Sequence, residues 1–417
     1  MADNSLTAAK YEEVEKLRQE AQAEIAAKLE VFFESVLEHS YKYSGAGSYF
    51  AQFHKTLARI DRYGIRTVTQ NNEHAGLTFM SRPKLNLTSG NLKQNRLLNM
   101  LNTKDPKSIQ FMIRMLLDTK LARTDPTCMN LVHESPFLDA NCPFMTPLTN
   151  CLESVSGFPS YNLETYTTEG GFFSEDLTFA VGADRNRKSF DLQLSFVDIQ
   201  GGIISALIQM WMEYIAALTV GEMIAYSEDV ENQRLNYTVS LYRFLLDPSK
   251  RYITRWCKCT GGFPISRPSG AVFDMTTSEI YVEAAKKFSV TFKFNHMGIE
   301  NDPIILKEFN MLVKRYNQYI EYADAVGNSN HLILDTTPES NYVGIPYIVP
   351  TAAGPMLQFR IPTAEMEDDT LNEELLQMHQ DIETTKSTLD TKINAILQSP
   401  TTVAPTVPVQ AGDITYV

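Results

Sequence analysis

Sulfur and imidazole side chains are the groups of this chain best suited to metal or nucleophile chemistry, and their spacing forms no recognisable site. Cys257 and Cys259 lie two apart in strand-like sequence, so both side chains would face the same side. A common zinc site needs a second such pair, which the chain lacks. The other cysteines and the nearest histidine also lack ligand spacing: Cys128, Cys142, Cys151 and His133. We therefore expect no metal, and structural thiols are the simpler interpretation.

Sequence motifs of the common enzyme classes are also missing. The chain has no phosphate-binding loop of the G-x-x-x-x-G-K-[ST] type, no HExxH zinc motif and no G-x-S-x-G nucleophile motif. Its seven histidines are scattered, and the acidic pair Asp368 and Asp369 falls in a polar stretch. We expect neither an enzyme nor a cofactor. An unrecognised enzyme stays an alternative, because a missing motif is weak evidence.

Composition narrows the class of protein further. The chain has 417 residues, 43% of them hydrophobic, which suits one principal domain with additions. Its net charge of −13 argues against sequence-independent binding to nucleic acid, which needs clustered lysine and arginine. Acidic residues replace the apolar run of a secretory signal, and we find no run of about 18 uncharged apolar residues. These features predict a soluble protein with reduced cysteines, made in a cytoplasm and without a membrane partner.

Two alternating stretches and one helix form the expected core, between about Tyr161 and Asn295. Apolar residues occupy every second position in 190–196 and 288–294, as in strands with one buried and one solvated face. Residues 201–218 carry an apolar stripe at spacings of three and four, which predicts a helix packed on the sheet. The residues expected to anchor that helix are Trp211, Tyr214 and Ile215.

Further strands are expected at 161–181, 234–246, 251–259 and 286–296, with a loop from Pro264 to Thr277. A turn at 182–188 would join 161–181 and 188–197 into one long hairpin. The outer edges of long strands carry backbone N–H and C=O groups without hydrogen-bond partners. This hairpin is therefore the expected contact with a neighbouring subunit. Its proposed contact residues are Phe190, Leu192, Leu194 and Phe196. An ordinary intramolecular hairpin is the alternative.

Both ends of the chain add helices to this core. Residues 8–38 predict a long amphipathic helix that lies either on the main domain or on a neighbouring subunit. In 364–398 apolar residues recur at steps of four and three, which indicates a short coiled coil contacting a partner protein or, equally, a helix docked on its own domain. The seam residues are Leu371, Leu375, Met378, Ile382 and Leu389.

The fold class predicted from these patterns is α+β, a β-sandwich or barrel with one packed helix and helical additions at both ends. The predicted organisation has six parts: a helical N-terminal region (1–123), a connecting loop (124–160), a β domain with a trailing helix (161–325), Pro-rich loops (326–363), a coiled-coil-like helix (364–398) and an extended tail (399–417).

The order of the core segments resembles the tail-tube fold of contractile-tailed bacteriophages, and is most similar to the baseplate proteins that initiate the tube. The resemblance covers about Tyr161 to Asn310. The segments that carry it are MWMEYI (210–215), LNYTVSLYRFLLD (235–247), RYITRWCKCTGGFPISRP (251–268) and KKFSVTFKFNHM (286–297).

The resemblance implies a structural virion protein of the tail, assembled in the host cytoplasm. It implies a ring, typically hexameric, whose sheets join into a barrel around a channel. Genomic DNA would pass through that channel without specific binding, and other tail or baseplate proteins would be the partners. The main tube subunit or a neck-proximal ring is an alternative position. A non-virion assembly adaptor or chaperone is the alternative of another class.

Overall fold

A computed structural model describes most of the core of the chain. The described residues are 75–124, 142–160, 162–184, 188–199, 201–247, 249–267, 287–316, 333–337, 345–351, 354–362 and 370–398, with single helical residues between 16 and 36. The predicted extended tail at 399–417 lies outside them.

The main sheet is antiparallel and open, so the described strands do not close into a barrel. Its path runs β1-β6-β7-β8-β5-β2, and a short strand, β9, also pairs with β7. The strands are β1 (Ala75–Met80), β2 (Leu152–Ser156), β5 (Phe190–Val197), β6 (Val239–Leu246), β7 (Ile253–Ser266), β8 (Lys287–Phe294) and β9 (His296–Met297). Together with the helices below, this confirms the predicted α+β class.

Helix α9 (Ile203–Val220) covers one face of this sheet. Both of its ends are glycines in the left-handed region, Gly202 (φ 66°) and Gly221 (φ 84°), where a side chain would be strained. At the C-terminal end the Gly221 N–H donates to the Leu218 carbonyl and the Glu222 N–H to the Ala217 carbonyl, the pattern of a Schellman cap. The helix therefore stops where the chain turns away from the sheet.

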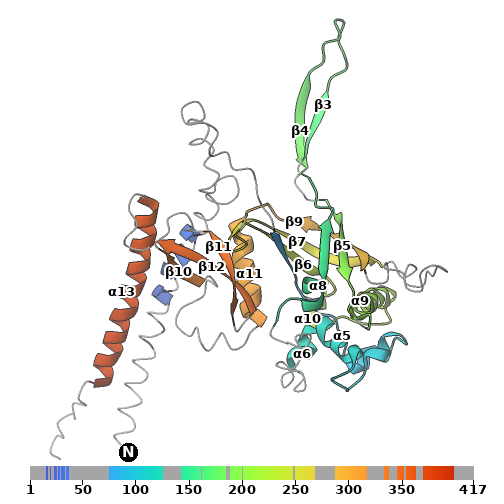
Figure 1. Cartoon of the computed structure of the whole chain (residues 1–417), viewed down its shortest axis with the longest axis horizontal. Helices are drawn as coiled ribbons and strands as arrows, with labels where there is room; N and C mark the ends of the chain where they lie inside the picture. The colour runs from blue at the N-terminus through green and yellow to red at the C-terminus, as the bar shows by residue number, and fades with distance from the viewer. Residues whose placement is uncertain are drawn as a thin grey trace, which may run out of the picture.

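Short helices extend the α9 layer away from the sheet (Figure 1). Ser108 caps the first turn of α5 by accepting a hydrogen bond from the Phe111 N–H. These elements are α4 (Ser89–Leu92), η3 (Leu98–Leu101), α5 (Ile109–Leu117), α6 (Thr119–Thr124), α8 (Thr146–Asn150) and α10 (Ser227–Glu231). The side chains of α4, η3, α5 and α8 join the same hydrophobic core as α9.

A second hydrophobic core lies on the opposite face of the sheet, because successive side chains of a strand point to opposite faces. On β6, Val239 and Leu241 enter the α9 core, whereas Tyr242, Phe244 and Leu246 enter the second one. That second core is completed by α11 (Pro303–Tyr316), β12 (Gly354–Pro362), α13 (Thr370–Gln398) and helical residues between 25 and 36. The strands β10 (Ile333–Thr337) and β11 (Pro346–Thr351) flank β12 in a separate sheet.

One two-stranded hairpin stands apart from both cores. Strand β3 (Asn162–Thr167) pairs with β4 (Thr178–Asp184) and with no other described strand. Figure 1 shows this ribbon projecting from the edge of the body, beyond β5.

Several predicted boundaries differ from these elements. The main sheet takes β1 and β2 from before residue 161, so the span 161–325 does not contain the whole sheet. The expected connecting loop 124–160 includes α8 and β2, and the expected Pro-rich loops 326–363 include β10, β11 and β12. Short strands with prolines at their ends lack the long alternation by which a strand is found in a sequence.

The loop predicted from Pro264 begins too early. Strand β7 continues to Ser266 because it exchanges partners: its pairing with β6 ends at Gly262, and Phe263 and Pro264 pair with β8. Proline is tolerated at such a position, where the strand is paired on one side and bulged. Gly262 is required at the crossover, since a Cβ atom there would come within 2.2 Å of the Phe294 ring.

Candidate assembly surfaces

The β3–β4 hairpin exposes apolar side chains over its whole length. Besides the two phenylalanines of its tip, five large apolar side chains of the hairpin are more than half exposed: Leu163, Tyr166, Leu177, Phe179 and Val181. Tyr166 and Phe179 are directly paired across the strands. An isolated two-stranded ribbon is at best marginally stable in water, and apolar patches on protruding elements mark interaction sites. The hairpin is therefore the strongest candidate for a contact with another chain.

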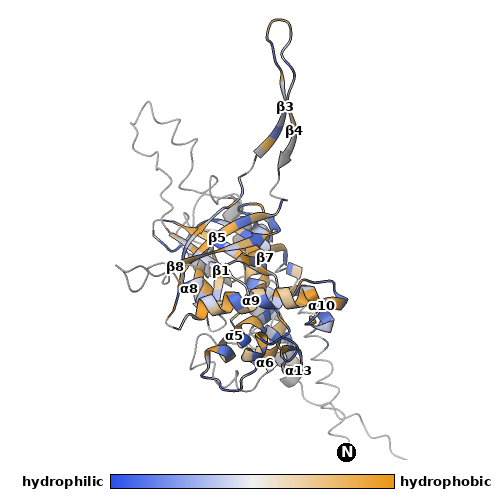
Figure 2. Cartoon of the chain, turned by 90° about the vertical axis from the view of Figure 1, so that its right-hand side faces the viewer, coloured by the Kyte–Doolittle hydropathy of each residue, from blue (hydrophilic) through white to orange (hydrophobic). Residues whose placement is uncertain are grey.

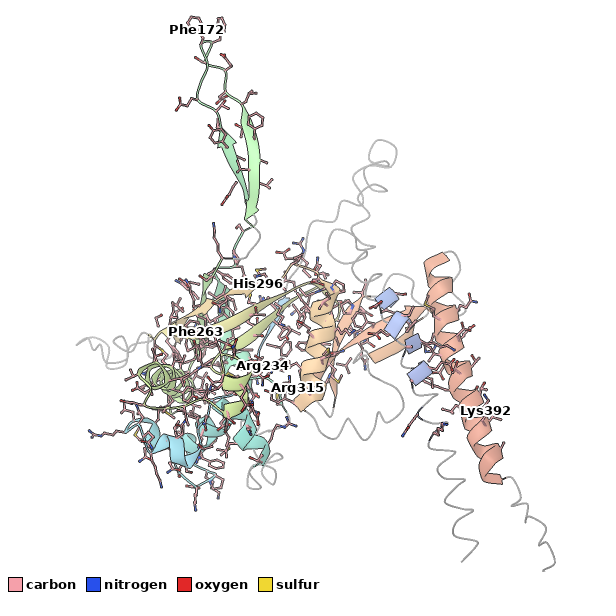
Figure 3. All side chains as sticks on the ribbon, turned by 180° about the vertical axis from the view of Figure 1, so that it is seen from behind. Phe172, Arg234, Phe263, His296, Arg315 and Lys392 are labelled. Atoms are coloured by element: carbon pink, nitrogen blue, oxygen red, sulfur yellow. The ribbon has the colours of Figure 1, made fainter. Side chains whose placement is uncertain are left out.

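The tip of the hairpin is an ordered turn. The Gly171 N–H donates to the Glu175 carbonyl at 2.8 Å, and the Phe173 N–H donates to Glu175 Oε2 at 2.8 Å. Ser174 adopts the left-handed conformation (φ 62°) that closes this turn. Phe172 and Phe173 meet edge to face and point into solvent, with Phe172 the outermost label in Figure 3. The turn thus presents two aromatic rings at the end of the projection.

The prediction of one long hairpin over 161–197 is wrong. Residues 182–188 do not form its turn, because β4 pairs with β3, and β5 pairs with β8 and β2. The structure places Leu192, Leu194 and Phe196 fully buried in the chain's own core, with Phe190 half-buried against Phe294. A surface that a neighbouring subunit could contact is therefore provided by β3 and β4.

The opposite face of β5 and β8 is solvated and polar. Across the two strands Ser195 and Ser289 share a hydrogen bond of 2.7 Å, and Asp191 pairs with Lys293 at 2.9 Å. Lys287 pairs with Glu153 of β2 at 2.5 Å. Because each lysine has an acidic partner, this face carries little net charge. The alternation in the sequence predicted one solvated face for these strands, and the burial pattern confirms it.

The three residues expected to anchor the core helix all pack in the hydrophobic core around α9. Trp211 is fully buried, contacts the Phe292 ring edge to face and donates from Nε1 to the Tyr237 carbonyl at 3.0 Å. The Tyr214 hydroxyl accepts from the Asn86 N–H and from Asn236, and Ile215 is partly buried. By length and composition alone α9 could cross a membrane, but core helices of soluble proteins pass the same test.

The seam of the C-terminal helix faces its own chain. Ile382 of α13 is buried in the second core, with Met378 and Leu389 packed against it. The side chains of Leu371 and Leu375 lie outside the described residues. Described residues of the predicted N-terminal helix cover this seam. The rings of Phe32 and His379 lie 5.9 Å apart between centroids in a tilted arrangement, and Lys28 donates to Thr385 at 3.1 Å. Described helical residues between 25 and 36 thus pack against α13.

A buried carboxylate fixes the helical layer. Asp118, between α5 and α6, accepts hydrogen bonds at 2.9 Å from the Leu87 and Leu121 N–H groups and another from the Tyr226 hydroxyl. Burial raises the pKa of Asp118 and that of Tyr226, whose hydroxyl also faces the Asp118 charge. A carboxylate with this many donors holds loops together, and it is not free to act on a substrate.

A second charged group lies beside this carboxylate. Lys120 and Lys84 donate to Glu228 at 2.6 and 3.0 Å, and these hydrogen bonds hold the pKa of the Glu228 carboxyl at about 2. Glu228 is exposed, so its ion pairs with the two lysines join α6 and α10 at the surface and add little stability.

The sulfur chemistry considered for Cys257 and Cys259 finds no support in the local geometry. Both lie buried in β7. The hydrogen bond that the Cys259 thiol makes to Cys257, together with burial, raises the pKa of Cys259 and keeps it protonated. Across the described ranges no group of three or more His, Cys, Asp or Glu side chains could hold a metal ion. Cys128 and His133 fall outside those ranges.

The pattern of the sequence did not single out the tip of the hairpin, although a signal was present. Two aromatic residues follow two glycines in the segment EGGFFSED (169–176). Such a run is apolar, flanked by acidic residues and too short for a strand, which is typical of a turn that presents side chains. Its exposure could be established only from the fold.

Comparison with known proteins gives one match that covers most of the chain. The family model described as "Putative phage tail tube protein" matches residues 20–351, a wider span than the resemblance of 161–310. No curated protein sequence matches this chain.

Solved structures with some similarity belong to contractile injection systems. The anti-feeding prophage cap (AFP tube terminating cap) is 15% identical over 35% of this chain and 78% of that chain, with a TM-score of 0.22. The PVC sheath/tube terminator in its extended state is 14% identical over 36% of this chain and 84% of that chain, with a TM-score of 0.21.

Proposed function

Because the chain belongs to the phage tail tube protein family, we propose that it is a structural virion protein whose copies close into a hexameric ring around the channel of a contractile tail. The observation that carries the proposal is the β3–β4 hairpin, whose apolar side chains have no cover in the described part of the chain. The hairpin packs on the neighbouring subunit of the ring. No catalytic step or cofactor is part of this function.

The open main sheet supports ring closure as well. Its outer strands β1 and β2 each pair with one strand only among the described residues. Unpaired edges invite pairing with another chain, and a closed ring satisfies all of them at once. The proposed ring therefore joins sheets from successive subunits into one wall.

The elements added to the sheet support one proposed position of the ring in the tail. Helix α13, the described helical residues between 25 and 36 that pack with it, and the β10-β12-β11 sheet enlarge the subunit on one side. A subunit stacked along a whole tube usually keeps a minimal fold, so these additions favour a specialised ring at the junction of baseplate and tube. There the remaining seam of α13, with Leu371 and Leu375, contacts another tail protein.

The main tube subunit is the second candidate, favoured by complementary surfaces at opposite ends of the subunit that are described below. The copy number per particle separates the two positions. A specialised ring requires one or two rings of subunits, whereas the tube requires many.

Ring formation is tested by making the hairpin polar without breaking it. Tyr166→Glu combined with Phe179→Lys replaces a directly paired, exposed apolar couple with opposite charges, which still attract across the strands. We expect soluble monomer with unchanged melting temperature and loss of the ring. Size-exclusion chromatography with light scattering measures the monomer, negative-stain electron microscopy detects the ring, and thermal unfolding gives the melting temperature. Val230→Glu with Ile299→Lys, two exposed apolar residues away from the hairpin, is the matched control. Normal rings from the hairpin variant would contradict the proposal.

The polar face of β5 and β8 is the proposed lining of the channel, and it should not bind DNA. Each lysine that meets phosphate displaces counterions and adds salt-dependent affinity, but Lys293 is neutralised by Asp191 and Lys287 by Glu153. We expect no measurable binding of the assembled protein to duplex DNA at ionic strengths of about 0.15 M.

The acidic partners are expected to be what prevents this binding. Asp191→Asn with Glu153→Gln should create DNA affinity that falls as salt rises, measured by fluorescence anisotropy. Glu383→Gln, which removes the acidic partner of Lys386 on α13, is the control and should not bind DNA. Tight, salt-sensitive binding by the unmodified protein would mean that this face anchors the genome.

A further inference from the structure

The hairpin tip combines exposed apolar rings with negative charge. Phe172 is 94% exposed and Phe173 85% exposed, the highest values among the large apolar residues of the described chain. Three carboxylates flank them: Glu169, Glu175 and Asp176, all exposed. No lysine or arginine lies between residues 162 and 182. The tip requires a partner surface that is apolar and positively charged.

The segment from Lys93 to Lys107 has that composition. It exposes Leu97 (45%) and Met100 (54%) around helix η3. Four exposed cations surround them, with a single exposed anion, Asp105: Lys93, Arg96, Lys104 and Lys107. None of the four cations forms a salt bridge with another described residue. In a chain of net charge −13, a surface that is both basic and apolar is unusual. Its positive charge favours binding of an acidic partner.

The two surfaces lie at opposite ends of the subunit. The hairpin points away from the body on one side of the sheet, and η3, α5 and α6 form the end on the other side (Figures 1 and 2). The view from behind shows the same arrangement, with Phe172 at the far end from these helices (Figure 3). One subunit cannot bring its own tip to its own 93–107 surface.

We infer that the hairpin tip of one subunit docks on the 93–107 surface of a second copy in the adjoining ring. The inference rests on the proposed ring and names the contact that stacks one ring on the next. Phe172 and Phe173 pack on Leu97 and Met100, and the tip carboxylates face the cations around them. Different patches meeting head to tail can repeat along an axis, as a tube requires.

One contact between a hairpin tip and the 93–107 surface binds weakly, whereas all the tips of a ring together bind strongly. The tip offers about eight residues, well below the area of a standard stable interface. When a ring presents all its tips at once, each later contact is intramolecular and the total affinity rises without new contacts. Stacking should therefore need rings and should weaken as salt screens the exposed charges.

Charge exchange tests the pairing. Glu169→Lys with Asp176→Lys reverses the tip and leaves Glu175, which holds the turn through the Phe173 N–H. Lys93→Glu with Arg96→Glu reverses the opposite surface. Either pair alone should abolish assemblies longer than one ring, and all four changes in one chain should restore them. Arg251→Glu with Lys392→Glu, which are exposed and belong to neither surface, controls for net charge. Sedimentation velocity and negative-stain electron microscopy measure the length of the assemblies.

The outcomes separate this inference from the proposed function. Single rings from each reversed pair, with stacking regained in the fourfold variant, support the inference. Stacks that persist in either pair, or no recovery in the fourfold variant, overturn the inference and leave the ring in place. A wild-type chain that forms neither rings nor stacks overturns both. A photo-crosslinker at Phe172 that captures residues 93–107 of another copy identifies the contact directly, and capture elsewhere overturns it.

Discussion

Trp211→Ala is expected to lower the free energy of unfolding by about 3–5 kcal/mol, the range for removing a large buried aromatic side chain. Trp211 is fully buried between α9 and the sheet, and it contacts the Phe292 ring. The substitution leaves a cavity and also leaves the Tyr237 carbonyl without its 3.0 Å donor. A loss of this size is a large share of the stability of a typical domain.

The measurement is urea unfolding of the monomer, followed by circular dichroism. Val220→Ala at the exposed end of the same helix is the control, because its side chain is 76% exposed and leaves no cavity. It should change stability by less than about 0.5 kcal/mol. A Trp211→Ala protein as stable as wild type would mean that α9 does not anchor the sheet.

Phe309→Ala is expected to have an effect of similar size, about 3–5 kcal/mol, on the opposite face of the sheet. Phe309 of α11 is fully buried at the centre of an aromatic cluster. Its ring lies 5.1–5.3 Å, between centroids, from four other rings: Phe79, Phe144, Tyr242 and Phe244. Aromatic pairs at this distance add to the energy of burial, so the truncation removes several contacts together.

Thermal and urea unfolding of the monomer test this second core independently of the first. Met311→Ala on the same helix, where the side chain is 43% exposed, is the matched control. A small effect of Phe309→Ala would show that α11 and the elements beyond it are loosely attached to the sheet. The hairpin variant Tyr166→Glu with Phe179→Lys should leave both unfolding curves unchanged, which separates assembly from folding.

Local periodicity was sufficient to identify β5, β8 and α9 of the main core, although it missed β2. Alternating residues in 190–196 and 288–294 and the wide stripe of 203–218 follow directly from the geometry of a strand and a helix. The buried and solvated faces of β5 and β8 were correct for this reason. The predicted bounds of the helix, 201–218, differ from those of α9 by two residues at each end, where Gly202 and Gly221 adopt the left-handed conformation that strains other residues.

The partners of these elements were decided by the tertiary structure. Alternation tells which face of β5 is buried, but β5 pairs with β8, about ninety residues away in sequence, rather than with the preceding strand. The seam of α13 shows that an apolar surface must be covered, yet only the fold shows that residues near Phe32 cover it. The exposure of Phe172 follows from the position of the hairpin beyond the sheet, since burial depends on what other segments reach a residue. Periodicity is a local property of the chain, whereas pairing, covering and exposure depend on contacts between distant segments.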